Sequence, residues 1–184
     1  MSTPPFIVNL AALRVTPGTR HHLVRSGPLS GLAITSSAVP AGAPVTVDAD
    51  LEIVDGGVVV TGTVSGPWVG ECRRCLRPVS GQLAATVREV YERAPRSHGD
   101  EHGDEIDTYP LTGDVVDLAP LARDAVFLEL PLAPLCRDDC AGLCPTCGAD
   151  LAEGPCGCAP TTGHAGWSAL DRLRSPDAMG ADST

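Results

Sequence analysis

The sequence predicts an α+β protein, mainly an antiparallel β-sheet with one central helix, a short C-terminal helix and a cysteine-rich tail. Three observations favour this fold class. Residues 44–54 alternate strictly between apolar and polar side chains, residues 118–130 have helical spacing, and six of the eight cysteines lie between residues 136 and 158. With only two Trp, two Tyr and two Phe, the core is expected to consist of aliphatic side chains.

Strands are expected to occupy most of the first half of the chain. The alternating run at 44–54 is typical of a half-buried strand in an antiparallel sheet. Asp55 and Gly56 are a favoured hairpin turn pair and lead into a second β-rich run at 57–65. Further strands are expected at about residues 67–72 and 81–91, and shorter ones near residues 6–9 and 20–25.

Residues 94–106 follow these strands and are polar and acidic and contain glycine, which predicts a mobile acidic loop. His98 and His102 lie four positions apart in this segment, a spacing that would suit a metal-binding pair on a helix. Helix signals are absent there, so a metal-binding histidine pair is not favoured.

A single helix is expected at about residues 118–130. Asp117 is a suitable N-cap, and Pro120 falls in the first turn, where the missing backbone N–H is tolerated. Pro131 should end the helix. Four apolar residues at helical spacing are predicted to belong to the core: Leu118, Leu121, Ala125 and Leu128.

The domain organisation follows from these elements. An antiparallel β domain is predicted over residues 1–134, including the helix, and a cysteine-rich tail over residues 135–174. Residues 175–184 are expected to be a disordered end. A short terminal helix in the tail is indicated by Trp167, Leu170 and Leu173.

The N-terminus lacks the features of a signal peptide, and no apolar run reaches the roughly 18 residues that a membrane span needs. A cytoplasmic protein with no membrane partner is therefore expected. In a reducing compartment, eight cysteines favour metal binding or redox chemistry over a framework of disulfides.

The net charge of −10 is unevenly spread along the chain. Residues 1–96 carry nine Arg and seven Asp or Glu, a balance of +2, whereas residues 97–184 carry four Arg and sixteen acidic residues, a balance of −12. The acidic half is expected to confer solubility, and an acidic docking face is the alternative.

The spacing of the cysteines predicts two metal sites with four thiolates each. The tail is therefore expected to be a zinc-knuckle tail. A C-x2-C turn lets two thiolates converge on one ion, with Zn–S distances near 2.3 Å. The first predicted site comprises Cys144, Cys147, Cys156 and Cys158. The second combines a pair at a hairpin tip with a pair after the helix, namely Cys72, Cys75, Cys136 and Cys140. Two zinc ions per chain are expected, in closed shells that stabilise the fold and do not catalyse, although ligands could be exchanged between sites.

Other interpretations of the cysteines are less favoured. Cysteine ligation alone does not exclude an iron–sulfur cluster. Free buried cysteines are common singly, but eight of them in this spacing would be unusual. A thioredoxin-like role for Cys72 and Cys75 is disfavoured, because that motif belongs at the start of a helix and a β-hairpin is expected here.

Three segments in this order resemble the YceD family of bacterial proteins, named for large-subunit ribosomal RNA accumulation, and specifically its cysteine-rich branch from high-GC Gram-positive bacteria. These are Gly70-Glu-Cys-Arg-Arg-Cys-Leu-Arg-Pro78, Asp117-Leu-Ala-Pro-Leu-Ala-Arg-Asp-Ala-Val-Phe-Leu-Glu-Leu-Pro-Leu-Ala-Pro134 and Cys140-Ala-Gly-Leu-Cys-Pro-Thr-Cys-Gly-Ala-Asp-Leu151. The likeness covers most of residues 5–174. It implies a role in accumulation of the large-subunit ribosomal RNA, through its processing or assembly, without enzymatic activity.

The resemblance makes precursor ribosomal RNA, a ribosomal protein, or both the expected partners. Arginines at a rigid tip suit phosphate contacts, and the candidates are Arg73, Arg74 and Arg77, with Arg14, Arg20 and Arg25 in a basic N-terminal stretch. Pairing of these arginines with the acidic half is the alternative.

A second hypothesis is a zinc-stabilised acidic adapter that docks a basic protein partner, which the net charge of −10 favours. An enzyme is disfavoured, because the histidines lie outside the cysteine clusters and the sequence shows no convergent set of carboxylates. No small-molecule substrate is evident.

Overall fold

The computed structural model of the protein describes residues 4–13, 18–93 and 108–159. The chain forms two compact units, residues 1–142 and residues 143–184. Cys136 and Cys140 thus belong to the first unit, whereas the sequence places the start of the tail at residue 135. Several sequence-based expectations lie outside the described residues: Arg14, the loop 94–106 with His98 and His102, the terminal helix near 167–173, and the end 175–184.

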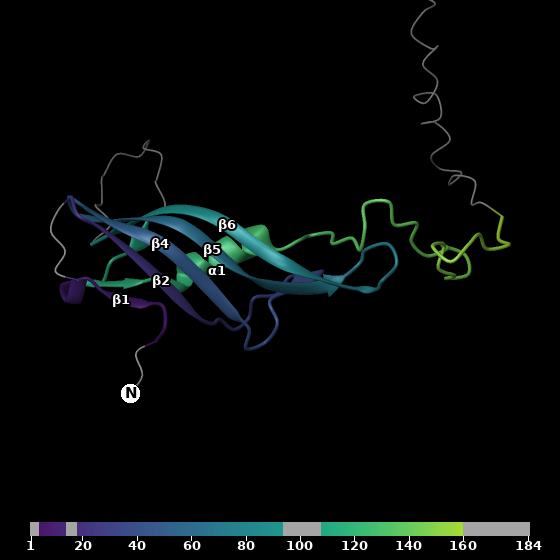
Figure 1. Ribbon diagram of the computed structural model, residues 1–184, viewed down its shortest axis with the longest axis horizontal. Coiled ribbons are helices and arrows are strands. Elements are labelled where there is room, and N and C mark those ends of the chain that lie inside the picture. Colours follow the sequence, from purple (N-terminus) through teal and green to yellow (C-terminus); the bar gives the residue numbers. More distant parts are fainter. Residues whose placement is uncertain (1–3, 14–17, 94–107, 160–184) are drawn as a thin grey trace, which may run out of the picture. The chain divides into compact units, whose positions relative to one another are not determined.

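The first unit is built on a six-stranded sheet, which confirms the mainly antiparallel α+β expectation. Its strands β2, β4, β5, β6 and β7 lie in that order, and β3 pairs with the far end of β5 (Figure 1). All neighbours are antiparallel except β6 and β7. The bounds are β2 Arg20–Pro28, β3 Ser37–Ala38, β4 Pro44–Val54, β5 Gly57–Glu71, β6 Pro78–Glu92 and β7 Tyr109–Pro110. A separate two-stranded sheet pairs β1 (Ile7–Asn9) with β8 (Val115–Asp117), and a 3-10 turn spans Ala11–Leu13.

The alternating run at 44–54 is a half-buried strand, as expected. Its buried residues are Val45, Val47, Ala49 and Leu51, and its polar residues lie on the opposite face, because successive side chains of a strand point to opposite sides. The Asp55-Gly56 turn closes the hairpin between β4 and β5, with Gly56 at a φ of 83° that glycine adopts at little cost.

The two strands expected at 57–65 and 67–72 are one continuous strand, β5, so that expectation is wrong. Gly66 and Pro67 do not interrupt it, because β6 pairs along the whole length of β5 and includes Pro67 opposite Gln82. On its other side, among the described residues, β5 pairs with β4 up to Ser65 and with β3 only from Val69. Pro67, which has no N–H to donate, therefore fits in the stretch of β5 between its pairing with β4 and its pairing with β3.

Helix α1 spans Ala119–Glu129 and ends before Pro131, close to the expected bounds. The assignment of Asp117 as the N-cap is wrong by one residue, since Leu118 occupies that position. The Asp117 carboxylate still accepts a hydrogen bond from the Ala119 amide at 2.9 Å. The buried helical residues are Leu121, Ala122, Ala125 and Val126. The assignment of Leu128 to the core is wrong, since its side chain is 88% exposed. No helix in the described residues is long and apolar enough to span a membrane.

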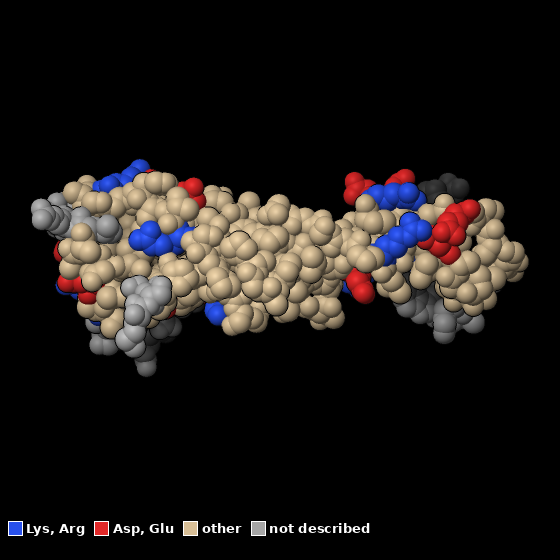
Figure 2. Space-filling view, turned by 60° about the horizontal axis from the view of Figure 1, so that its bottom comes forward, with Lys and Arg blue, Asp and Glu red and all other residues tan. Residues whose placement is uncertain are grey.

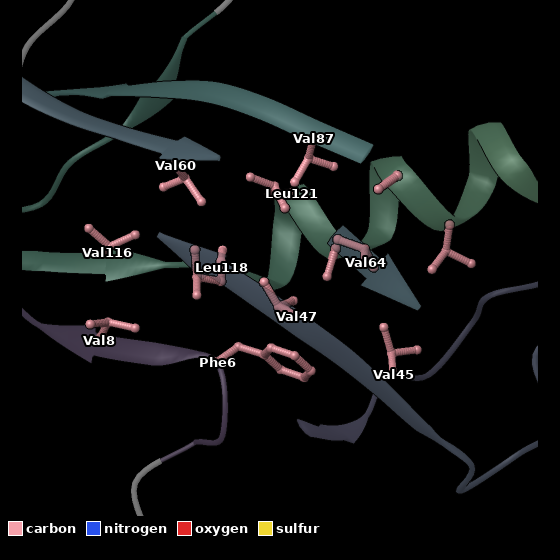
Figure 3. Packing of buried hydrophobic residues seen from close by; sticks show 14 of the residues in the cluster. Phe6, Val8, Val45, Val47, Val60, Val64, Val87, Val116, Leu118 and Leu121 are labelled. Atoms are coloured by element: carbon pink, nitrogen blue, oxygen red, sulfur yellow. The ribbon is translucent and has the colours of Figure 1, made fainter. Parts of the chain in front are cut away.

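The core lies between the inner face of the sheet and a layer made of α1, β1 and β8. Valines of the sheet point toward Leu118 and Leu121, and Phe6 and Val8 pack into the same cluster from the N-terminal segment (Figure 3). The core is almost wholly aliphatic, as the composition predicts. Each fully buried Val or Leu stabilises the fold by roughly 1.5–3 kcal/mol, so this core provides a rigid base for the hairpin that β5 and β6 form.

Candidate metal centres

The β5–β6 hairpin ends in a knuckle that carries Cys72 and Cys75, as predicted for a hairpin tip. The Cys72 amide donates to the Arg77 carbonyl and the Leu76 amide donates to the Cys72 carbonyl, each at 2.8 Å. These bonds fold the Cys-x2-Cys turn back on itself, so that both thiols face inward and are buried. The turn requires a left-handed residue after the second cysteine, and Leu76 takes that position with a φ of 60°.

The backbone carbonyls of the segment after α1 accept hydrogen bonds from residues at β3 and at the hairpin tip. The Ser36 and Ser37 hydroxyls both donate to the Pro131 carbonyl, at 3.1 and 2.9 Å. Closer to the tip, the Arg73 amide donates to the Pro134 carbonyl at 2.9 Å. The segment therefore arrives at the knuckle in a fixed register, which delivers the second pair of cysteines.

Arg74 fixes the loop that contains this second pair. Its guanidinium Nη1 donates to the carbonyls of Asp138 and Cys140, at 3.0 and 2.9 Å. The side chain thus bridges the hairpin tip and residues 138–140, which are remote in sequence. Sequence reasoning treated Arg74 as an RNA contact and missed this bond, because nothing local to Arg74 indicates which carbonyls it meets.

The four sulfur atoms of this first-unit cluster lie within 4.8 Å of one another: those of Cys72, Cys75, Cys136 and Cys140. The Cys72 and Cys140 sulfurs are 3.8 Å apart, and those of Cys75 and Cys136 are 3.7 Å apart. A tetrahedral ion with metal–sulfur bonds near 2.3 Å would place its ligands about 3.8 Å apart. A disulfide would need about 2.05 Å, so the separations fit a four-thiolate metal shell.

The tail cluster lies in the second unit and is formed by Cys144, Cys147, Cys156 and Cys158, whose sulfurs also lie within 4.8 Å of one another. Its knuckle repeats the backbone pattern of the first. The Cys144 amide donates to the Ala149 carbonyl at 2.8 Å, and the Gly148 amide donates to the Cys144 carbonyl at 2.9 Å. The Thr146 amide points at the Cys144 sulfur at 3.4 Å. This cluster is less buried than the first, because only Cys144 is buried here, whereas three of the four cysteines are buried in the first.

Backbone N–H groups and neighbouring thiols separate the pKa values within each cluster. The backbone N–H of Cys136 is the main cause that lowers the pKa of Cys72 to about 6. The Cys140 thiol, which hydrogen bonds to Cys136, raises the pKa of Cys136 to about 12. In the tail, the backbone N–H of Cys147 lowers the pKa of Cys144 to about 6. In each cluster, one thiol, Cys72 or Cys144, therefore has a lowered pKa and forms a thiolate more readily than a free cysteine.

The structure therefore groups the eight cysteines into the two sets of four that their spacing suggested, and either set could hold a metal ion. Each set supplies four sulfur ligands, which fill a tetrahedral shell. Four donors from one soft ligand type suit zinc or iron and not the hard cations Mg²⁺ and Ca²⁺.

The candidate arginines do not form one surface. Arg73, Arg74 and Arg77 lie at the knuckle and are exposed. Arg20 forms an ion pair with Glu52 at 3.1 Å, and the strand register places it near the opposite end of β5, roughly 40 Å from the knuckle at 3.3 Å per residue. The Arg25 guanidinium donates to the Val24 carbonyl. Basic and acidic side chains lie next to each other on the face drawn in Figure 2.

Sequence reasoning also missed Gly70 and Leu76. A Cβ on Gly70 would lie 2.5 Å from the Ser36 carbonyl oxygen and 3.4 Å from Pro134, so only glycine lets these segments approach. The signal for Leu76 was present in the chain, since Gly148 occupies the same position after the tail Cys-x2-Cys pair.

One family model and several relatives match the chain. The family described as "Large ribosomal RNA subunit accumulation protein YceD" matches residues 60–174. An uncharacterized protein of Mycobacterium tuberculosis is 42% identical over 154 residues, covering 82% of this chain and 73% of the relative. One of Mycobacterium leprae is 32% identical over 180 residues, covering 94% and 79%.

A plant relative is more distant. The maize protein named "Large ribosomal RNA subunit accumulation protein YCED homolog 1, chloroplastic" is 25% identical over 159 residues, covering 72% of this chain and 54% of the relative. No solved structure matches the chain.

Proposed function

Because the chain belongs to the YceD family, we propose that it supports the accumulation or processing of large-subunit ribosomal RNA as a non-enzymatic ribosome-biogenesis factor in the cytoplasm. It does so by binding RNA, a ribosomal protein, or both. The observation that carries the RNA-binding part is the knuckle, where arginines project from a turn that buried cysteines and a fixed linker hold rigid.

Each cysteine cluster holds one zinc ion in this proposal. The shell at the hairpin comprises Cys72, Cys75, Cys136 and Cys140, and the tail shell comprises Cys144, Cys147, Cys156 and Cys158. Bound zinc supplies cross-links between segments, and a shell filled by four thiolates leaves no position for a reacting water. Both centres therefore serve folding, which agrees with a non-enzymatic role.

The knuckle has a local charge that suits RNA. Residues 71–77 contain three Arg and one Glu, a balance of +2 in a protein whose net charge is −10. Arg73 and Arg77 contact phosphates in this proposal, whereas Arg74 holds the cysteine loop. Rigid placement lowers the entropic cost of each contact, and each phosphate contact releases counterions.

The second candidate function is a zinc-stabilised acidic adapter for a basic partner such as a ribosomal protein. The balance of −12 over residues 97–184 favours it, because a basic protein is steered toward an acidic surface. Binding of a basic protein in the absence of RNA would support this function, and salt-dependent binding of RNA alone would support the first.

Depletion of the protein, followed by gradient profiling and mapping of precursor ends, tests the function. Free large subunits and mature large-subunit RNA should fall while small subunits stay normal. A rescue copy with Arg73→Gln and Arg77→Gln should fail to restore them and should flatten the salt dependence of RNA binding by about 1.4 units of slope. The control replaces Arg88, near the other end of β6, and Arg93, which follows β6 and forms an ion pair with Asp114, by Gln, and should rescue. Full rescue by the knuckle variant would make the adapter the better account.

A further inference from the structure

Leu76 occupies a backbone position that Gly148 occupies in the knuckle of the tail cluster. The two turns share their amide-to-carbonyl pattern, and the residue after the second cysteine has a φ of 60° at Leu76 and 74° at Gly148. The left-handed region is unfavourable for a residue with a side chain and especially rare for a bulky one. The tail shows that glycine completes the same turn, so the turn itself does not need a leucine.

Packing does not account for this leucine either. The Leu76 side chain is 59% exposed, and Val69, on the adjoining end of β5, is 42% exposed. Both line a shallow pocket of about 400 Å³ whose lining also includes Ile34 and two charged residues, Arg73 and Glu71. A strained residue whose apolar side chain remains in solvent beside a pocket points to a ligand for that side chain.

The charge beside the pocket selects the kind of ligand. The knuckle, Glu71 included, has a local balance of +2 over residues 71–77, which favours an anion, while the pocket wall offers aliphatic side chains. A flat apolar group joined to a phosphate matches both features. Single-stranded RNA presents such groups, because its unstacked bases can be splayed into protein pockets.

We propose that this pocket binds one unpaired nucleotide of an RNA strand, with the base against Leu76, Val69 and Ile34 and the adjacent phosphate facing Arg73. The proposal rests on the RNA-binding function above and specifies its contact. It makes the knuckle a reader of single-stranded RNA, because a base inside a duplex is not available to the pocket.

The test compares two probes of equal length and charge, an unstructured oligouridylate and an oligomer whose central nucleotides lack their bases. The metal-loaded protein should bind the complete oligomer roughly 5- to 10-fold more tightly, since burying a base adds affinity that phosphate contacts alone do not supply. Leu76→Gly should abolish this preference while leaving the salt dependence unchanged. Arg73→Gln should reduce the salt slope by about 0.7 and keep the preference.

Three further variants separate recognition from folding. Leu76→Gly should retain two metal ions and its thermal stability, because Gly148 supports the same turn. Val69→Thr keeps the shape and the strand preference of its residue but makes the wall polar, and should also weaken the preference. Leu128→Ala removes a leucine that is 88% exposed and does not line the pocket, and should change nothing.

Failure of this inference differs from failure of the proposed function. Salt-dependent RNA binding without a preference for bases, or with a preference that survives both Leu76→Gly and Val69→Thr, overturns the nucleotide pocket and leaves RNA binding standing. Absence of binding to either oligomer overturns the nucleotide pocket together with the RNA-binding part of the proposed function. Binding of a basic peptide that depends on Leu76 and excludes RNA assigns the pocket to the adapter function and likewise overturns the inference.

Discussion

At the scale of single residues, the knuckle depends on close approach between backbones. Gly70 lies where β3, β5 and the linker after α1 meet, and its missing side chain is what allows the Ser36 carbonyl to come close. The spacing of the cysteines alone suggested the two sets of four, because thiolate pairs that share an ion need short, regular separations. The supporting contacts were not predictable, since each joins residues more than 30 positions apart.

Gly70→Ala should destabilise the metal-loaded protein by about 1–3 kcal/mol, the usual cost of an overpacked site. The added methyl would lie 2.5 Å from the Ser36 carbonyl oxygen, so a backbone segment has to move. Gly66→Ala is the matched control in the same strand, because its methyl would lie no closer than 3.5 Å to any neighbour. Thermal or urea denaturation measures both, and equal stability of the two variants would contradict the role given to Gly70.

Arg74 should behave differently from Arg73. Arg74→Gln removes two hydrogen bonds to the loop of Cys136 and Cys140, and should lower stability by about 1 kcal/mol and speed metal release to a chelator. Arg73→Gln should leave both quantities near their original values, because the Arg73 contact to Pro134 uses the backbone amide. Identical release rates for the two variants would show that Arg74 does not hold the loop.

At the scale of elements, the sequence was most informative where one periodicity dominated. Strand β4 follows its strict alternation, and α1 is bounded by Asp117 and Pro131. Prediction failed where tertiary pairing overrode local signals. Gly66 and Pro67 suggested a break, yet the neighbouring β6 keeps β5 continuous. Leu128 fits a helical stripe, but the buried face of α1 is turned toward Ala122 and Val126.

The two metal centres should therefore respond differently to ligand loss. Cys75→Ser should expose the hairpin tip and residues 131–140 to hydrogen exchange, since its cluster joins segments that are 61 or more positions apart. Cys144→Ser should expose only residues 143–158, because all four ligands of the tail cluster lie within that stretch. Hydrogen exchange followed by mass spectrometry resolves the two regions. Equally local effects would refute the bridging role of the first cluster.

At the scale of the whole molecule, two separate units each contain a complete four-thiolate cluster. Protein purified without added metal should therefore contain close to two zinc ions per chain by native mass spectrometry. A chelator should remove them in two steps, with the more exposed tail centre emptied first. One zinc per chain would contradict the two-site proposal, and a brown preparation with iron and labile sulfide would replace zinc by an iron–sulfur cluster.

The different spans of the two clusters also have a consequence for the time course of synthesis. Cys72 and Cys75 leave the ribosome long before Cys136 and Cys140, and a separation of 61 to 68 residues corresponds to about 3–14 s at ordinary elongation rates. During that interval the hairpin has only half of its ligands. The tail cluster needs only the fifteen residues from Cys144 to Cys158, so its ligands emerge within a few seconds of one another. Metal capture by the first cluster therefore marks the moment at which β5, β6 and the linker after α1 have all reached their places.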